Sequence, residues 1–184
     1  MNSRKIIYLA GLFFAFNLFV ACDNEPPETY VNVAEASFFS TANQEPDKPV
    51  GFQVQVLAPH SSFPDDLSLQ FRLKFADGGK THVKNLNDAS TMILAEANWL
   101  QSGSTTGWHM HPGVAFVRML EGTIEVVWEN ECMPRTYTAG DSWLDPGLIH
   151  KATAISEGAK AYVIFLGIPN GQPATVWVAP RDCN

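Results

Sequence analysis

Three histidines, at positions 109, 111 and 150, are the residues of this chain best suited to chemistry. Imidazole nitrogens are ligands for several transition metals. Side chains at i and i+2 of a β-strand project from the same face, so a strand through His109 and His111 would hold two rings side by side. His150, 39 positions after His111, would join them from a neighbouring strand. The chain has only five histidines, and this spacing predicts one three-imidazole metal site in a β-structure.

The elements that must position these rings are predicted to be short strands. From residue 50 onward, short apolar stretches alternate with turn residues, and residues 67–75 place apolar and polar side chains on opposite faces. Further strands are expected over 50–57, 91–100, 115–120, 123–129, 151–154, 162–167 and 175–178. No apolar stripe of helical period extends beyond two turns. The pattern predicts an all-β protein, either a sandwich or a barrel.

Two segments around the histidines form recognisable motifs. Residues 103–122 contain a glycine, five residues, a His-x-His pair and then a strand that ends in a Gly122 turn. Residues 140–150 run from Gly140 through Asp-Pro-Gly to His150. These segments resemble the first and second conserved motifs of the cupin superfamily, although Pro and Gly are adjacent where the family often spaces them. The resemblance implies a single jelly-roll-like β-barrel with His109, His111 and His150 as metal ligands directed inward.

The resemblance also implies a fourth ligand, which this chain lacks. Cupins usually have a glutamate four or five positions after the second histidine, where Ala115 and Phe116 stand here. Glu121 precedes the turn at the far end of that strand and is not an evident substitute. Three histidines suit one divalent transition metal, and Fe, Zn, Ni, Cu and Mn all remain open. A site without a carboxylate would favour an anionic or chelating small-molecule ligand.

Three functions follow from this reading. Three-histidine iron sites in cupins resemble those of thiol and β-diketone dioxygenases, which implies an oxygen-dependent dioxygenase acting on a small chelating molecule. The first alternative is a non-catalytic cupin that binds or senses a small ligand or a metal. The second is a metal-independent sugar isomerase or epimerase, for which no catalytic base is evident. Cupin barrels often pair through edge strands, so the resemblance also implies a homodimer.

The N-terminal residues predict export. Basic residues precede an apolar run that ends at residue 21, which is typical of a signal peptide over 1–21. Cys22 follows a small residue, as in a bacterial lipobox, so this thiol is predicted to be lipidated. An ordinary cleavable signal with an incidental cysteine is the alternative. Residues 22–48 are expected to be a flexible tether, and residues 49–184 the barrel domain. The expected location is the cell envelope, at the periplasmic or outer-membrane face.

The cysteine count supports an exported protein, and the net charge argues against one class of partner. With Cys22 lipidated, Cys132 and Cys183 remain, and an oxidising compartment favours a disulfide between them. Without Arg4 and Lys5, which lie in the signal peptide, the net charge falls from −7 to −9. This charge argues against a nucleic-acid partner. Membrane attachment is therefore expected through the lipid anchor.

Overall fold

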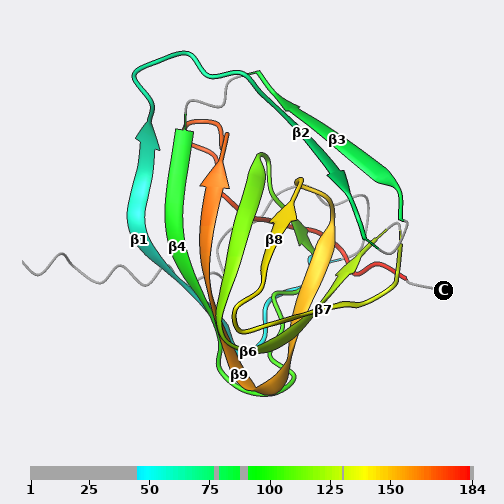
Figure 1. The fold of residues 1–184 in the computed structure, drawn as a ribbon. Coiled ribbons are helices and arrows are strands. Elements are labelled where there is room, and N and C mark those ends of the chain that lie inside the picture. Colours follow the sequence, from blue (N-terminus) through cyan, green and yellow to red (C-terminus); the bar gives the residue numbers. More distant parts are fainter. Residues whose placement is uncertain (1–44, 77–78, 88–90, 130, 183–184) are drawn as a thin grey trace, which may run out of the picture.

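The computed structural model describes residues 45–182 except 77–78, 88–90 and 130, and over these residues it contains strands and no helix (Figure 1). The strands are β1 (Phe52–Ser62), β2 (Leu69–Lys74), β3 (Thr81–Leu86), β4 (Thr91–Trp99), β5 (His109–Met110), β6 (Val114–Trp128), β7 (Arg135–Thr138), β8 (Ser142–Asp145), β9 (His150–Leu166) and β10 (Val176–Trp177). The predicted all-β class is confirmed.

Eight of the strands form one curled sheet. Its path runs β1-β4-β9-β5-β10, and β6 pairs with β9, β7 and β8. β2 and β3 form a separate two-stranded sheet, which lies beside the curled sheet in Figure 1. Because the curled sheet folds over on itself, the inward faces of its strands enclose a common interior. The single β-barrel predicted from the sequence is confirmed.

A long antiparallel pair, β6 with β9, forms the spine of the barrel. The sequence indicates a turn at Gly122, yet the structure carries β6 straight through it, with register shifts on both sides of this residue. Gly122 has a φ of 72°, and a Cβ there would lie 2.0 Å from the Gly158 carbonyl oxygen. Glycine is therefore required at this bend. The apparent turn is an irregularity within one strand, at which the spine curls.

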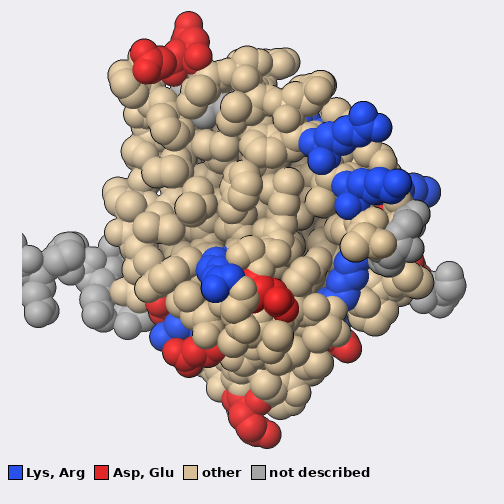
Figure 2. All heavy atoms as spheres, viewed as in Figure 1, with Lys and Arg blue, Asp and Glu red and all other residues tan. Residues whose placement is uncertain are grey.

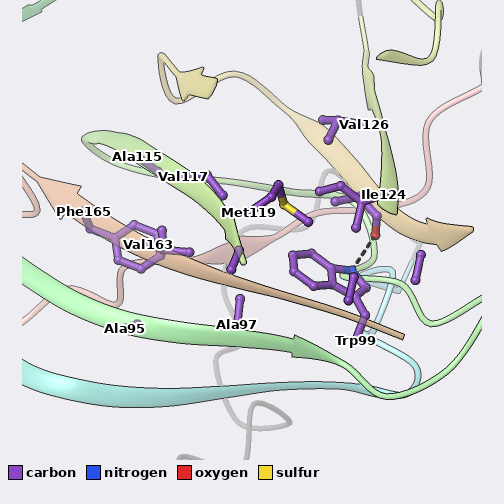
Figure 3. Close-up of a cluster of buried hydrophobic side chains, with 14 of the residues drawn as sticks. Ala95, Ala97, Trp99, Ala115, Val117, Met119, Ile124, Val126, Val163 and Phe165 are labelled. Carbon is purple, nitrogen blue, oxygen red and sulfur yellow. Dashed lines mark hydrogen bonds between the residues drawn. The ribbon is translucent and has the colours of Figure 1, made fainter. Parts of the chain in front are cut away.

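The bend also explains which side chains fill the core. In the main core cluster, the β6 residues are odd-numbered before Gly122 and even-numbered after it: Ala115, Val117 and Met119, then Ile124, Val126 and Trp128. Val114, at the start of β6, is buried in a second cluster with Leu86. A one-residue irregularity reverses the alternation of faces, so both halves of the strand direct apolar side chains inward. Figure 3 shows Val117, Met119 and Ile124 in one cluster with Ala97 and Trp99 of β4. The Trp99 indole N–H donates to the Ala152 carbonyl oxygen at 3.3 Å.

The outer surface is uneven in charge and polarity. Figure 2 shows a broad uncharged face, with basic side chains gathered over β2 and β3. Phe116, Tyr162 and Ile164, on the adjacent strands β6 and β9, are each about 40% exposed. Over the described residues no helix is long and apolar enough to cross a lipid bilayer. The predicted homodimer stays a prediction.

Two hydrogen bonds join Asp47, near the N-terminal boundary of the domain, to the barrel. The backbone N–H of Asp47 donates to the Val178 carbonyl oxygen at 2.8 Å, and its Oδ2 accepts from the Trp108 N–H at 3.0 Å. The chain is thus bound to the barrel at residue 47. The predicted signal peptide, Cys22, most of the predicted tether and Cys183 lie outside the described residues, so the disulfide and the lipid anchor stay predictions.

Candidate metal centre

Strand pairing brings the three predicted histidines together. His109 on β5 is directly paired with His150, the first residue of β9, and Trp128 of β6 pairs with His150 on its other side. His111 follows immediately after β5. All three side chains are buried, with 5% or less of each residue exposed. The predicted convergence of three imidazoles inside the barrel is confirmed.

The spacing of the three rings fits a single small cation. Ring centroids lie 4.1 Å apart for His109 and His150, 4.9 Å for His109 and His111, and 5.4 Å for His111 and His150. One ring nitrogen from each residue lies within 4.8 Å of the other two. Two ligands on opposite sides of an ion with bonds of about 2.1 Å are about 4.2 Å apart. Small adjustments of the rings would thus allow all three to contact one ion.

Backbone carbonyls orient the three rings. The Nδ1 atoms of His109, His111 and His150 lie 2.9, 2.7 and 2.9 Å from the carbonyl oxygens of Gly107, Ala174 and Leu148, respectively. A carbonyl oxygen only accepts, so each Nδ1 must carry the proton. Each neutral ring then keeps its lone pair on Nε2. Outer hydrogen bonds of this kind are typical of histidines that bind metals.

Burial keeps these rings neutral. It lowers the pKa of His109 to about 3, assisted by the charge of His150, and lowers the pKa of His150 to about 4. Burial also lowers the pKa of His111 well below its usual value, and the charges of the other two histidines add to this effect. Neutral imidazole is the metal-binding form. The chemistry of the donor set therefore fits a transition-metal ion.

A buried carboxylate beside the histidines was not anticipated from the sequence. Asp145, the last residue of β8, is 0% exposed. Its Oδ1 accepts from the backbone N–H groups of Gly147 at 2.9 Å and Leu148 at 3.2 Å. Its Oδ2 lies 3.4 Å from Nε2 of His111 and 3.3 Å from Nδ1 of His150, and has no hydrogen-bond partner among the described residues.

The charge state of Asp145 is set mainly by its environment. Burial raises the pKa of this carboxyl to about 7, opposed by the charge of His109 and by the N–H groups of Gly147 and Leu148. The distances to His111 and His150 fall within ion-pair range, but both rings are neutral, so these contacts are not formal ion pairs. A nearby cation would favour the ionised carboxylate.

The sequence contained a signal for Asp145. Trp143 and Asp145 are two residues apart in a strand, so they share a face, and Trp143 lines the interior cavity. Asp145 also pairs across β8 and β6 with Ala115, one of the two positions where the cupin pattern expects glutamate. Phe116, the other position, is 40% exposed on the outer face. The clue in the sequence was the spacing of Asp145 from Trp143, whereas its place opposite Ala115 comes from the register of β8 against β6.

The histidines form part of the wall of a small apolar cavity of about 60 Å³. Its other walls are mainly aromatic and aliphatic, including Phe52, Val54, Trp99, Trp143, Phe165 and Trp177. No charged residue is among the described side chains that line it, and besides the histidines the polar members are Thr106 and Thr175. A molecule in this cavity would meet the three histidines, the two threonines and otherwise mainly aromatic and aliphatic side chains.

Several known proteins are similar to this chain. Residues 100–166 match the family model described as "Cupin domain". No curated protein matches the sequence. A cupin-like protein from Thermotoga maritima shares 17% identity, covering 77% of this chain and 87% of that chain with a TM-score of 0.47.

Two further structures have similar values. The polyketide cyclase RemF from Streptomyces resistomycificus shares 13% identity over 71% of this chain and 78% of its own, with a TM-score of 0.42. An RmlC-like cupin from Shewanella frigidimarina shares 17% identity over 73% and 94%, with a TM-score of 0.41. These values are too low to transfer an activity. The family match spans both histidine motifs, so residues 100–166 match a cupin domain.

Proposed function

We propose that this cupin domain binds one divalent transition metal through Nε2 of His109, His111 and His150. The observation that carries the proposal is the set of three Nδ1–H donors held by backbone carbonyls, which leaves the Nε2 lone pair of each neutral, buried ring as the acceptor. One ring nitrogen of each histidine lies within 4.8 Å of the other two. Side chains held in a fixed orientation lose little further freedom when they bind, which favours a specific site. The identity of the metal is left to elemental analysis.

We further propose an oxygen-dependent oxidation as the activity of this centre. A redox-active metal such as iron, when bound, would supply the activation of O₂. The chain itself would orient the substrate and exclude water, because the cavity beside the histidines is walled by aromatic and aliphatic side chains. The lack of lysine and arginine among the described lining residues favours an uncharged molecule with two metal-binding oxygen or sulfur atoms.

Oxygen uptake by iron-loaded protein tests the activity. We expect uptake with an uncharged β-diketone or dithiol, and much less with a carboxylate-bearing thiol of similar size. His150→Ala, loaded in parallel, is the control for oxidation by free iron. No uptake with any member of the panel, despite bound iron, would refute the dioxygenase proposal.

A non-catalytic metal or ligand binder is the second candidate, and the size of the cavity favours it. The cavity has about 60 Å³, whereas an apolar cavity that holds benzene has about 150 Å³. A larger substrate would have to extend beyond it or displace side chains. Tight retention of metal without oxygen uptake would support this candidate. A metal-independent sugar isomerase has less support, because no carboxylate, lysine or tyrosine is among the described lining residues.

The proposed location is the cell envelope, with attachment through a lipid on Cys22. The support is in the sequence alone, where an apolar segment ends in a small residue before this cysteine. An oxidising compartment would also suit the predicted disulfide between Cys132 and Cys183.

A further inference from the structure

We infer that Asp145 is the anionic partner of the metal centre and replaces the charge of the glutamate that position 115 lacks; this inference rests on the metal binding proposed above. Asp145 on β8 and Ala115 on β6 are direct cross-strand partners, and both are buried to 1% exposure or less. Directly opposed residues in an antiparallel pair have Cβ atoms about 4.5–5.5 Å apart. A carboxylate at 145 therefore enters the barrel at the same level as one at 115.

The orientation of the carboxyl group supports this role. Two backbone N–H donors, from Gly147 and Leu148, hold Oδ1, and Oδ2 is left facing His111 and His150. Oδ2 is buried and lacks a hydrogen-bond partner among the described residues. A buried carboxylate is unfavourable unless a cation or donors compensate it. A cation held by the histidines would provide that compensation.

The geometry assigns Asp145 the part of a charge partner rather than a ligand. The group of atoms within 4.8 Å of one another contains nitrogens of the three histidines and no oxygen of Asp145. The charge of Lys84 also lowers the pKa of the Asp145 carboxyl, but this is the smallest of the effects on that pKa. A divalent metal with three neutral histidines has a net charge of +2. Counting an ionised Asp145 as part of the site lowers this net charge to +1. This removes much of the sequence-based reason to expect an anionic ligand.

Metal affinity of the full protein tests the inference directly. Asp145→Asn keeps the oxygen that accepts from Gly147 and Leu148 and removes the charge, while Asp66→Asn makes the same change at an exposed position. Competition with a chromophoric chelator gives the Kd for Zn²⁺. We expect at least a tenfold weaker Kd for Asp145→Asn, as for other outer partners of metal ligands. We expect less than a twofold change for Asp66→Asn.

Two further readouts separate charge from structural support. The loss of affinity should be smaller for Cu⁺ than for Zn²⁺, because a monovalent ion gains less from a nearby anion. Co²⁺ bound to Asp145→Asn should keep a visible spectrum close to that of the wild type, since the three histidines still bind. Equal losses for both ions, or a changed Co²⁺ spectrum, would assign Asp145 a purely structural role and overturn the inference.

A second pair of variants, in which the carboxylate moves from position 145 to position 115, tests the inference even if Asp145→Asn does not fold. In A115D/D145A the carboxylate moves to β6, and A115N/D145A has the same shape without the charge. The Asp form should bind Zn²⁺ at least tenfold more tightly than the Asn form, and equal affinities would contradict the inference.

Wild-type protein that fails to bind metal, or binds it equally well after His109→Ala, would refute the proposed function as well. Equal affinities of the wild type and Asp145→Asn would refute this inference alone.

Discussion

His109 and His150 are paired directly across β5 and β9, with ring centroids 4.1 Å apart. β5 contains only two residues, and this pair is its one contact in register with β9. The histidine from the first motif and the histidine from the second are thus joined by the sheet itself. Both rings are further held by carbonyl oxygens two residues before them in the chain, those of Gly107 and Leu148.

Replacing either ring should remove the metal and leave the barrel folded. His109→Ala and His150→Ala each delete one of three nitrogens, and we expect less than a tenth of the wild-type metal content by elemental analysis. His60→Gln is the matched control, because His60 lies on β1 and bonds to the Ile168 carbonyl oxygen instead of facing the centre. Unchanged metal content in either alanine variant would refute the ligand assignment.

Stability of the metal-free protein should fall as the solution is acidified below about pH 6.5. The folded-state pKa values of His109, about 3, and His150, about 4, lie below the value of about 6.5 expected in the unfolded chain. Unfolding therefore takes up protons below pH 6.5, and each histidine removes about 1.4 kcal/mol of stability per pH unit until its folded pKa is approached.

Asp145 acts in the opposite direction but is outnumbered. Its folded pKa of about 7 exceeds the unfolded value of about 4, so the stability that it contributes is present at low pH and is lost as pH rises between these values. Urea unfolding with a chelator present, at pH 4.5 to 7, measures the net effect. His150→Gln should have a shallower dependence on pH. A stability that rises on acidification would contradict the assigned charge states.

Gly147→Ala should destabilise the turn that carries His150. Gly147 has a φ of 83°, and a Cβ there would lie 2.5 Å from the Gly113 carbonyl oxygen. Gly103 has a similar φ of 80° but nothing within 4 Å of its would-be Cβ, so Gly103→Ala isolates the backbone cost. That cost is about 1–2 kcal/mol. Gly147→Ala should lose clearly more in urea unfolding, and equal losses would show that the close approach is unimportant.

Cys132 and Cys183 should be joined in the exported protein. The Arg181 Nε lies 3.0 Å from Oε1 of Glu129, which places the chain two residues before Cys183 beside the loop that holds Cys132. A disulfide closing a segment of this length stabilises by about 4 kcal/mol in the chain-entropy model. Peptide mapping by mass spectrometry without reductant should find the linked pair. Two alkylated thiols in protein from the envelope would contradict it.

Cys22→Ser should release the protein from membranes. The lipid is predicted to be the anchor, because the net charge of the chain is negative and does not favour binding to anionic lipid. Fractionation of cells that express each form would show the wild type with membranes and the variant in the soluble envelope fraction. Continued membrane association of the variant would count against lipidation.

The sequence by itself determined the fold class and the three histidines. Alternation of polar and apolar residues is a local property of each strand, and only a few residue types bind transition metals, so both are legible along the chain. The position of the missing glutamate was equally legible, because Ala115 and Phe116 stand at fixed distances from His111. The strand boundaries were harder to predict from the sequence, because Gly122 is typical of a turn and is instead a bend within β6.

Tertiary structure alone decided that a carboxylate accompanies the histidines and that the cavity beside them is small and apolar. β8 has only four residues, and its register against β6 is what places Asp145 opposite Ala115. Such a register depends on pairing between residues far apart in the chain, and so does the burial that shifts the pKa of Asp145. Neither has a counterpart in local sequence pattern, because both are set by neighbours that only folding supplies.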